Sequence, residues 1–106
     1  MKDGILKNIL TGKEEKICIK VCRDSSNSNI YSVFILSNNI DLNGWPANNN
    51  DKKNYKYSYV ISNNYTSFEE AKLKLKKIIL KPYPIWTFGG KYTAIFSKSK
   101  FEEIEL

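Results

Sequence analysis

The residues best suited to chemistry in this sequence are aromatic side chains and lysines near the middle of the chain. They lie along or just before one short alternating tract: Trp45, Lys52, Lys53, Tyr55, Lys56, Tyr57 and Tyr59. Aromatic rings can stack on bases while lysines follow the phosphates, which is how single strands are bound without sequence readout. The pattern therefore predicts a backbone-directed binding site for single-stranded or structured nucleic acid, either DNA or RNA.

The same tyrosines also have a purely structural interpretation. Tyr55, Tyr57 and Tyr59 alternate with smaller or charged residues, so a strand over residues 55–61 would place them on one face. If a helix covers that face, the rings belong to the core and their hydroxyls reach its rim. Both interpretations stay open, because the pattern does not say which face of the sheet is covered.

Catalysis is not expected from this composition. The sequence contains no histidine, the commonest general base and a frequent metal ligand. Cys18 and Cys22 alone do not make a zinc site, and as nucleophiles they would have only lysines and carboxylates as bases. Gly89-Gly90 is an isolated pair that favours a turn over a phosphate-binding loop. The sequence therefore predicts a protein that is not an enzyme and uses no metal or cofactor.

Length and charge limit the remaining possibilities. The 106 residues are enough for one hydrophobic core, so a single domain over 1–106 is expected. The net charge is +6, with Arg23 as the only arginine, which suits a nucleic-acid partner or plain solubility. No apolar run is long enough for a signal peptide or a membrane span. A cytoplasmic location is therefore expected, with no membrane partner and with reduced cysteines.

One main helix is predicted over residues 66–80. Thr66 or Ser67 can cap it, and carboxylates follow at the spacing of a capping box. Its apolar residues recur with helical periodicity and form one core-facing stripe: Phe68, Ala71, Leu75, Ile78 and Ile79. Proline at position 82 ends the helix.

The other elements are expected to be a short helix and strands that the main helix covers. The short helix spans residues 3–11, and the strands span 15–23, 30–37, 55–61 and two tracts of 83–97 around the Gly89-Gly90 turn. Residues 24–29 and 38–54 are predicted as irregular, and 98–106 as a last helical turn or an edge strand. The fold class is therefore α+β, with an antiparallel sheet of about five strands.

Two leucines of the main helix lie outside its apolar stripe. Leu73 and Leu80 are seven residues apart and could contact a flanking strand. Alternatively, they could form a small exposed interface for a protein partner or for a second copy in a homodimer.

The predicted order of the first five elements resembles that of the double-stranded RNA-binding domain. Proteins of that family bind RNA phosphates through lysines at the start of the last helix. The corresponding stretch here is Ser67 to Lys72, and it contains Glu69 and Glu70 where cations are required. The resemblance is therefore one of element order alone.

Three kinds of binding protein agree with these observations. The first is the basic nucleic-acid-binding protein described above. The second is a protein-binding inhibitor or accessory factor encoded by a phage or plasmid, of the anti-defence type. The third is a protein that holds a nucleotide-like ligand between aromatic rings and lysines.

Overall fold

The structure is a computed structural model that describes residues 2–23, 29–48 and 51–96. Its strands are β1 (Lys2–Asn8), β2 (Glu14–Arg23), β3 (Tyr31–Ser37), β4 (Trp45–Pro46), β5 (Tyr57–Tyr65), β6 (Tyr83–Trp86) and β7 (Lys91–Phe96). Between β3 and β4 runs a short 3₁₀ helix, η1 (Ile40–Leu42), and between β5 and β6 runs the α-helix α1 (Phe68–Ile79). The predicted turn at 24–29 lies mostly outside the described residues, and the predicted tail element at 98–106 lies entirely outside them.

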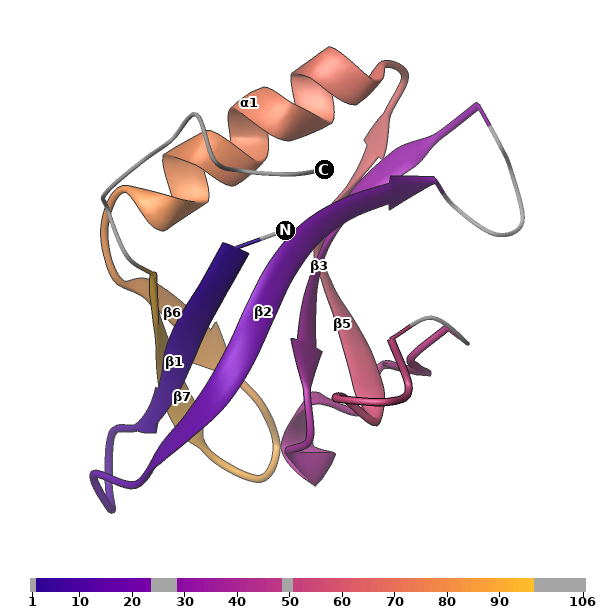
Figure 1. The fold of residues 1–106 in the computed structure, drawn as a ribbon. Helices are drawn as coiled ribbons and strands as arrows, with labels where there is room; N and C mark the ends of the chain where they lie inside the picture. The colour runs from indigo at the N-terminus through magenta and orange to yellow at the C-terminus, as the bar shows by residue number, and fades with distance from the viewer. Residues whose placement is uncertain (1, 24–28, 49–50, 97–106) are drawn as a thin grey trace.

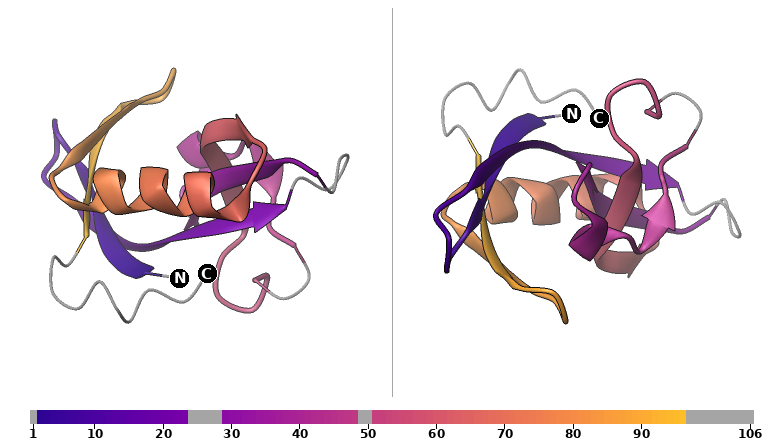
Figure 2. Two further views of the ribbon diagram at one scale, coloured as in Figure 1. Left: turned by 90° about the horizontal axis from the view of Figure 1, so that it is seen from above. Right: turned by 90° about the horizontal axis from the view of Figure 1, so that it is seen from below.

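The strands of the described chain form one antiparallel sheet in the order β4-β5-β3-β2-β1-β7-β6. The sheet curls into a half-barrel, and α1 lies on its concave side (Figures 1 and 2). Because the barrel is not closed, the elements at its two ends, β4-β5 and β6-β7, approach each other without pairing. The hollow described below lies between them.

The predicted fold class is wrong in the number of strands and in the N-terminal helix. The described chain is mostly β, with seven strands and a single α-helix instead of about five strands and two helices. The resemblance to the double-stranded RNA-binding domain rested on a predicted order that begins with a helix. It is wrong as well, because the first element of the structure is the strand β1. The missed elements are β1 and two elements in the segment 38–54 that was predicted as irregular: η1 and the two-residue β4, which pairs with β5.

The segment predicted as a helix over 3–11 contains β1 because it pairs on both sides. β1 hydrogen-bonds with β2 and with β7, which satisfies its backbone groups along both edges. Of the apolar side chains in the segment predicted as a helix, Leu6 is buried, whereas Ile5 and Leu10 are exposed, so the helical stripe does not exist. Gly12 has a φ of 76° in the β1–β2 connection, a backbone conformation that favours glycine.

The predicted main helix is confirmed. It begins two residues after the predicted start and ends one residue before the predicted end. Ser67 is its N-cap, and its side chain accepts a hydrogen bond from the Glu70 N–H at 3.2 Å. The predicted stripe faces the sheet: Ala71, Leu75, Ile78 and Ile79 are buried, and Phe68 packs at the edge of the core.

Apolar side chains are buried on both faces of the sheet. The main core lies under α1 and includes Ile19 and Ile35. A second cluster consists of Cys18, Leu36, Ala47 and Tyr55. Because Cys18 and Leu36 alternate with main-core residues along paired strands, this cluster lies on the opposite, convex face. β3 is therefore apolar on both sides, and the strand predicted over 30–37 lies in the interior of the sheet, between β5 and β2.

Within the described residues, no helix is long and apolar enough to cross a membrane.

Candidate binding cleft

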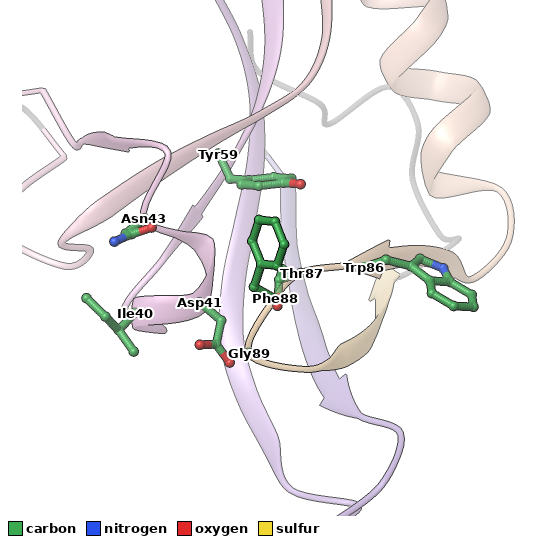
Figure 3. A pocket seen from close by; sticks show the side chains of 8 residues that line it. All are labelled: Ile40, Asp41, Asn43, Tyr59, Trp86, Thr87, Phe88 and Gly89. Atoms are coloured by element: carbon green, nitrogen blue, oxygen red, sulfur yellow. The ribbon is translucent and has the colours of Figure 1, made fainter.

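An open cleft of about 600 Å³ lies between η1, β5 and the turn that joins β6 to β7 (Figure 3). We call this hollow the cleft throughout. Its lining residues are Ile40, Asp41, Asn43, Tyr59, Trp86, Thr87, Phe88 and Gly89. A hollow of this size can accept one or two large side chains or a small ligand.

The η1 wall is fixed to the sheet at several points. Leu42 is fully buried in the main core, which anchors the 3₁₀ turn. Asn39 caps this turn by accepting a hydrogen bond from the Asp41 N–H at 2.9 Å, and its amide donates to the Glu15 carboxylate at 2.6 Å. The exposed Ile40 side chain is therefore presented by a well-anchored backbone.

The opposite wall is a tight turn held by its own hydrogen bonds. The Thr87 N–H donates to the Gly90 carbonyl at 2.9 Å, and the Gly90 N–H donates to the Thr87 hydroxyl at 3.0 Å. The predicted hairpin around Gly89-Gly90 is thus confirmed, with β6 and β7 as its strands. Phe88 and Gly89 form the tip of this turn.

Asp41 joins the two walls. Its carboxylate accepts a hydrogen bond from the hydroxyl of Tyr92, which is buried on β7. The carboxylate also lies directly against Gly89, where any Cβ would overlap it. Glycine at position 89 is therefore required by close approach, and the turn is braced against η1.

Aromatic and aliphatic side chains form the exposed rim of the cleft. Phe88 is fully exposed, Trp86 is 66% exposed and Ile40 is 59% exposed. In Figure 3 the Phe88 ring lies on the side of Tyr59, whereas Trp86 extends away from the other labelled side chains. Lys91 lies over the Trp86 ring, with its ammonium 4.8 Å from the ring centre. Among the described residues, Phe88 has no aromatic partner.

The cleft itself is poor in charge. Asp41 is the only charged residue among those that line it. Burial and the hydrogen bond to Asp41 raise the pKa of Tyr92 above its usual value, so the tyrosine stays protonated and continues to donate. A hollow with apolar walls and one engaged carboxylate suits an apolar side chain better than a phosphate.

The structure does not bring the predicted row of tyrosines together on one exposed face. Tyr55 precedes β5 and is buried in the cluster on the convex face. Tyr59 packs against the main core on the concave face and also lines the cleft. Tyr57 is half-buried. Their rings therefore do not form a continuous stacking surface.

The predicted lysines and Trp45 do remain accessible. Trp45 is 67% exposed on the edge strand β4, and Lys52, Lys53 and Lys56 are exposed. The Ala47 N–H donates to the Lys56 carbonyl at 3.0 Å, which places Lys56 beside the end of β4. We call these four residues the lysine patch. Whether they bind nucleic acid stays a prediction.

The loop that carries the lysine patch is tied down beneath its surface. Lys20 on β2 donates a hydrogen bond to the Asp51 carboxylate at 2.7 Å, and both side chains are largely buried. Burial lowers the pKa of Lys20, but the hydrogen bond to Asp51 and the neighbouring Cys22 outweigh it and leave this pKa raised. Lys20 therefore stays protonated at neutral pH and continues to donate this hydrogen bond.

Leu73 and Leu80 are both accessible. Leu73 is 59% exposed on α1 and Leu80, the C-cap residue of α1, is 50% exposed, so the structure does not bury them against a flanking strand. That they contact a protein partner or a second copy stays a prediction.

Neither cysteine has the environment of a nucleophile. Burial is the main cause that raises the pKa of Cys18 to about 11, and burial also raises the pKa of Cys22. Both thiols are therefore protonated at neutral pH, where a nucleophile needs to be a thiolate.

The sequence analysis did not identify the exposed residues at the rim of the cleft, which are Phe88, Trp86 and Ile40. One signal was available: the stretch from Trp86 to Gly90 places a large aromatic residue inside a hairpin turn, where small or polar residues predominate. A phenylalanine at such a tip is exposed by geometry. No comparable signal marks Ile40 or Asp41, because their role depends on a turn far away in the sequence.

Comparisons with protein-family models, with curated proteins and with solved structures give no match to this chain.

Proposed function

We propose that this protein is a non-enzymatic protein-binding module, of the inhibitor or accessory-factor kind, which holds its partner at the cleft. The observation that carries the proposal is Phe88, a fully exposed aromatic ring on a turn that is braced to η1. The partner would insert an apolar side chain between Phe88 and Tyr59 and cover the rim.

Energetics favour Phe88 as the anchor of such an interface. Burying an aromatic side chain of this size is worth roughly 1.5–3 kcal/mol. Binding also costs less when the backbone that carries the anchor is already ordered, and the hydrogen bonds of the turn order the backbone around Phe88. Exposed aromatic residues around a hollow are the usual composition of binding hot spots.

The first test selects short peptides that bind the intact protein from a displayed random library. We expect enriched peptides to share one or two large apolar residues and to shift the amide resonances of residues 40–43 and 86–90. Phe88→Ser should weaken binding of the selected peptides about tenfold or more, because the anchor is lost.

Leu10→Ser is the matched control. Leu10 is 80% exposed on the β1–β2 connection, away from the residues that line the cleft, so its loss should leave peptide affinity unchanged. Peptides that bind Phe88→Ser as tightly as the wild type would exclude the cleft as the binding site.

A second candidate function is nucleic-acid binding at the lysine patch. It is favoured by one observation, that exposed Trp45 and three exposed lysines lie on one anchored segment. Lysines that neutralise phosphates make affinity fall steeply with salt, whatever the sequence of the oligonucleotide. The cleft would take no part in this binding, since it contains a carboxylate and no lysine.

The second candidate is tested with Lys52→Glu/Lys53→Glu. This variant should lose affinity for all oligonucleotide sequences alike, and wild-type affinity should fall steeply between about 50 and 200 mM salt. Lys7→Glu/Lys13→Glu makes the same change in net charge at other exposed lysines and serves as control. Equal losses in the two variants would show that net charge alone matters, and absence of binding at the lower salt would remove this function.

A further inference from the structure

The outer face of α1 carries two exposed leucines that the fold does not use. Successive helical residues turn by about 100°, so Leu73 and Leu80, seven apart, differ in direction by only about 20°. They point away from the sheet, which α1 contacts through Ala71 and Leu75. Figures 1 and 2 show no other described element over this side of the helix.

Charged residues of opposite sign lie at the two ends of this face. The first turn carries Glu69 and Glu70, and the last turn carries Lys76 and Lys77. Viewed along the helix axis, the directions of these four side chains differ from that of Leu73 by at most about 60°. None of these four residues forms an ion pair with another described residue. Along the helix the face is therefore acidic in the first turn, apolar at Leu73, basic at Lys76 and Lys77, and apolar again at Leu80.

Such a face is complementary to a second copy of itself. Two helices that pack antiparallel about a two-fold axis exchange ends, so the acidic end of one meets the basic end of the other. With Leu73 placed on the axis, Glu69 lies opposite Lys77 of the second copy and Glu70 lies opposite its Lys76. The helix dipoles are then also antiparallel.

The alternative register, which places Leu73 opposite Leu80 of the second copy, is disfavoured by charge. It brings Lys76 and Lys77 of both copies to the centre of the contact, where four like charges repel. We therefore propose that α1 is a homodimer interface, in which two chains pack their helices antiparallel with Leu73 on the two-fold axis. This inference does not depend on the function of the cleft.

A single pair of short helices makes a small interface. Stable complexes bury about 1,200–2,000 Å² in total, more than helices of this length offer alone. The dimer is therefore expected to be weak, and its population should rise with protein concentration. Sedimentation velocity over a concentration series measures this directly.

Charge reversal gives the sharpest test. Glu69→Lys/Glu70→Lys makes the whole face basic, and Lys76→Glu/Lys77→Glu makes it acidic. Each variant alone should dimerise about tenfold or more weakly than the wild type, because like charges then face each other. An equimolar mixture of the two variants should dimerise again, since every opposed pair is then of opposite sign.

Two further variants separate this interface from general effects. Leu73→Asp should abolish the dimer while the circular-dichroism spectrum stays that of the folded wild type. Lys52→Glu/Lys53→Glu changes the net charge as much as Lys76→Glu/Lys77→Glu does, but away from α1, and should leave the dimer intact. A wild-type protein that stays monomeric throughout the series, or a mixture that does not dimerise, would overturn the proposal.

Discussion

At the scale of single residues, the cleft depends on a contact between Asp41 and Gly89. The carboxylate occupies the space that a Cβ on Gly89 would need, and it is held there by the Tyr92 hydroxyl. This contact brings the tip of a hairpin against a 3₁₀ turn that lies nearly fifty residues earlier. Neither residue stands out in the sequence, because the role of each depends on its contact with the other.

The contact predicts strongly non-additive mutations. Gly89→Ala should lower the free energy of unfolding by roughly 1–3 kcal/mol, because the methyl group forces the turn away from Asp41. In an Asp41→Ala background the same Gly89→Ala change should be neutral or slightly stabilising, since the space is open and alanine restricts the unfolded chain. Urea denaturation of the four proteins of this cycle measures both values. Equal costs of Gly89→Ala in the two backgrounds would show that the brace does not exist.

At the scale of elements, the sequence predicted what short-range patterns determine. The stripe and cap of α1, the strand at β2 and the Gly89-Gly90 turn follow from local patterns, and the structure contains all three. β1 was missed because its conformation depends on pairing with β7, which comes much later in the chain. The row of tyrosines was misplaced because a bend before β5 turns Tyr55 to the other face of the sheet.

Tyr55 also anchors the loop of the lysine patch, and this makes stability depend on alkaline pH. Burial is the main cause that raises the pKa of Tyr55 from 10.0 to about 12 and that of Cys18, in the same cluster, from 9.0 to about 11. A group whose pKa is raised by folding adds stability below its unfolded pKa and loses it as the pH rises through the folded value. The free energy of unfolding should therefore fall between about pH 9 and pH 12.

Tyr55→Phe tests the assignment of this pH dependence. Phenylalanine keeps the buried ring and removes the ionisable hydroxyl, so the loss of stability above pH 10 should become smaller. The measurement is urea denaturation of wild type and variant at a series of pH values. The same decline in both proteins would assign the effect to other groups.

At the scale of the whole molecule, three surfaces remain available to partners. The cleft lies between the two ends of the curled sheet, the lysine patch lies on the loop beside β4, and the outer face of α1 points away from the sheet (Figure 1). Of these, sequence patterns indicated the lysine patch and the two leucines of α1. The cleft could not be predicted, because it is made by the curvature of the sheet, which brings η1 and the β6–β7 turn together.

The central claim, that the cleft holds a protein partner, is tested most directly by cross-linking in cells of the source organism. The photoreactive residue p-benzoylphenylalanine is introduced at position 88 in one variant and at position 10 in another. Position 10 is a similarly exposed site away from the cleft-lining residues. We predict that illumination links a discrete protein to position 88 and not to position 10. No cross-linked protein at position 88, or the same proteins at both positions, would contradict the claim.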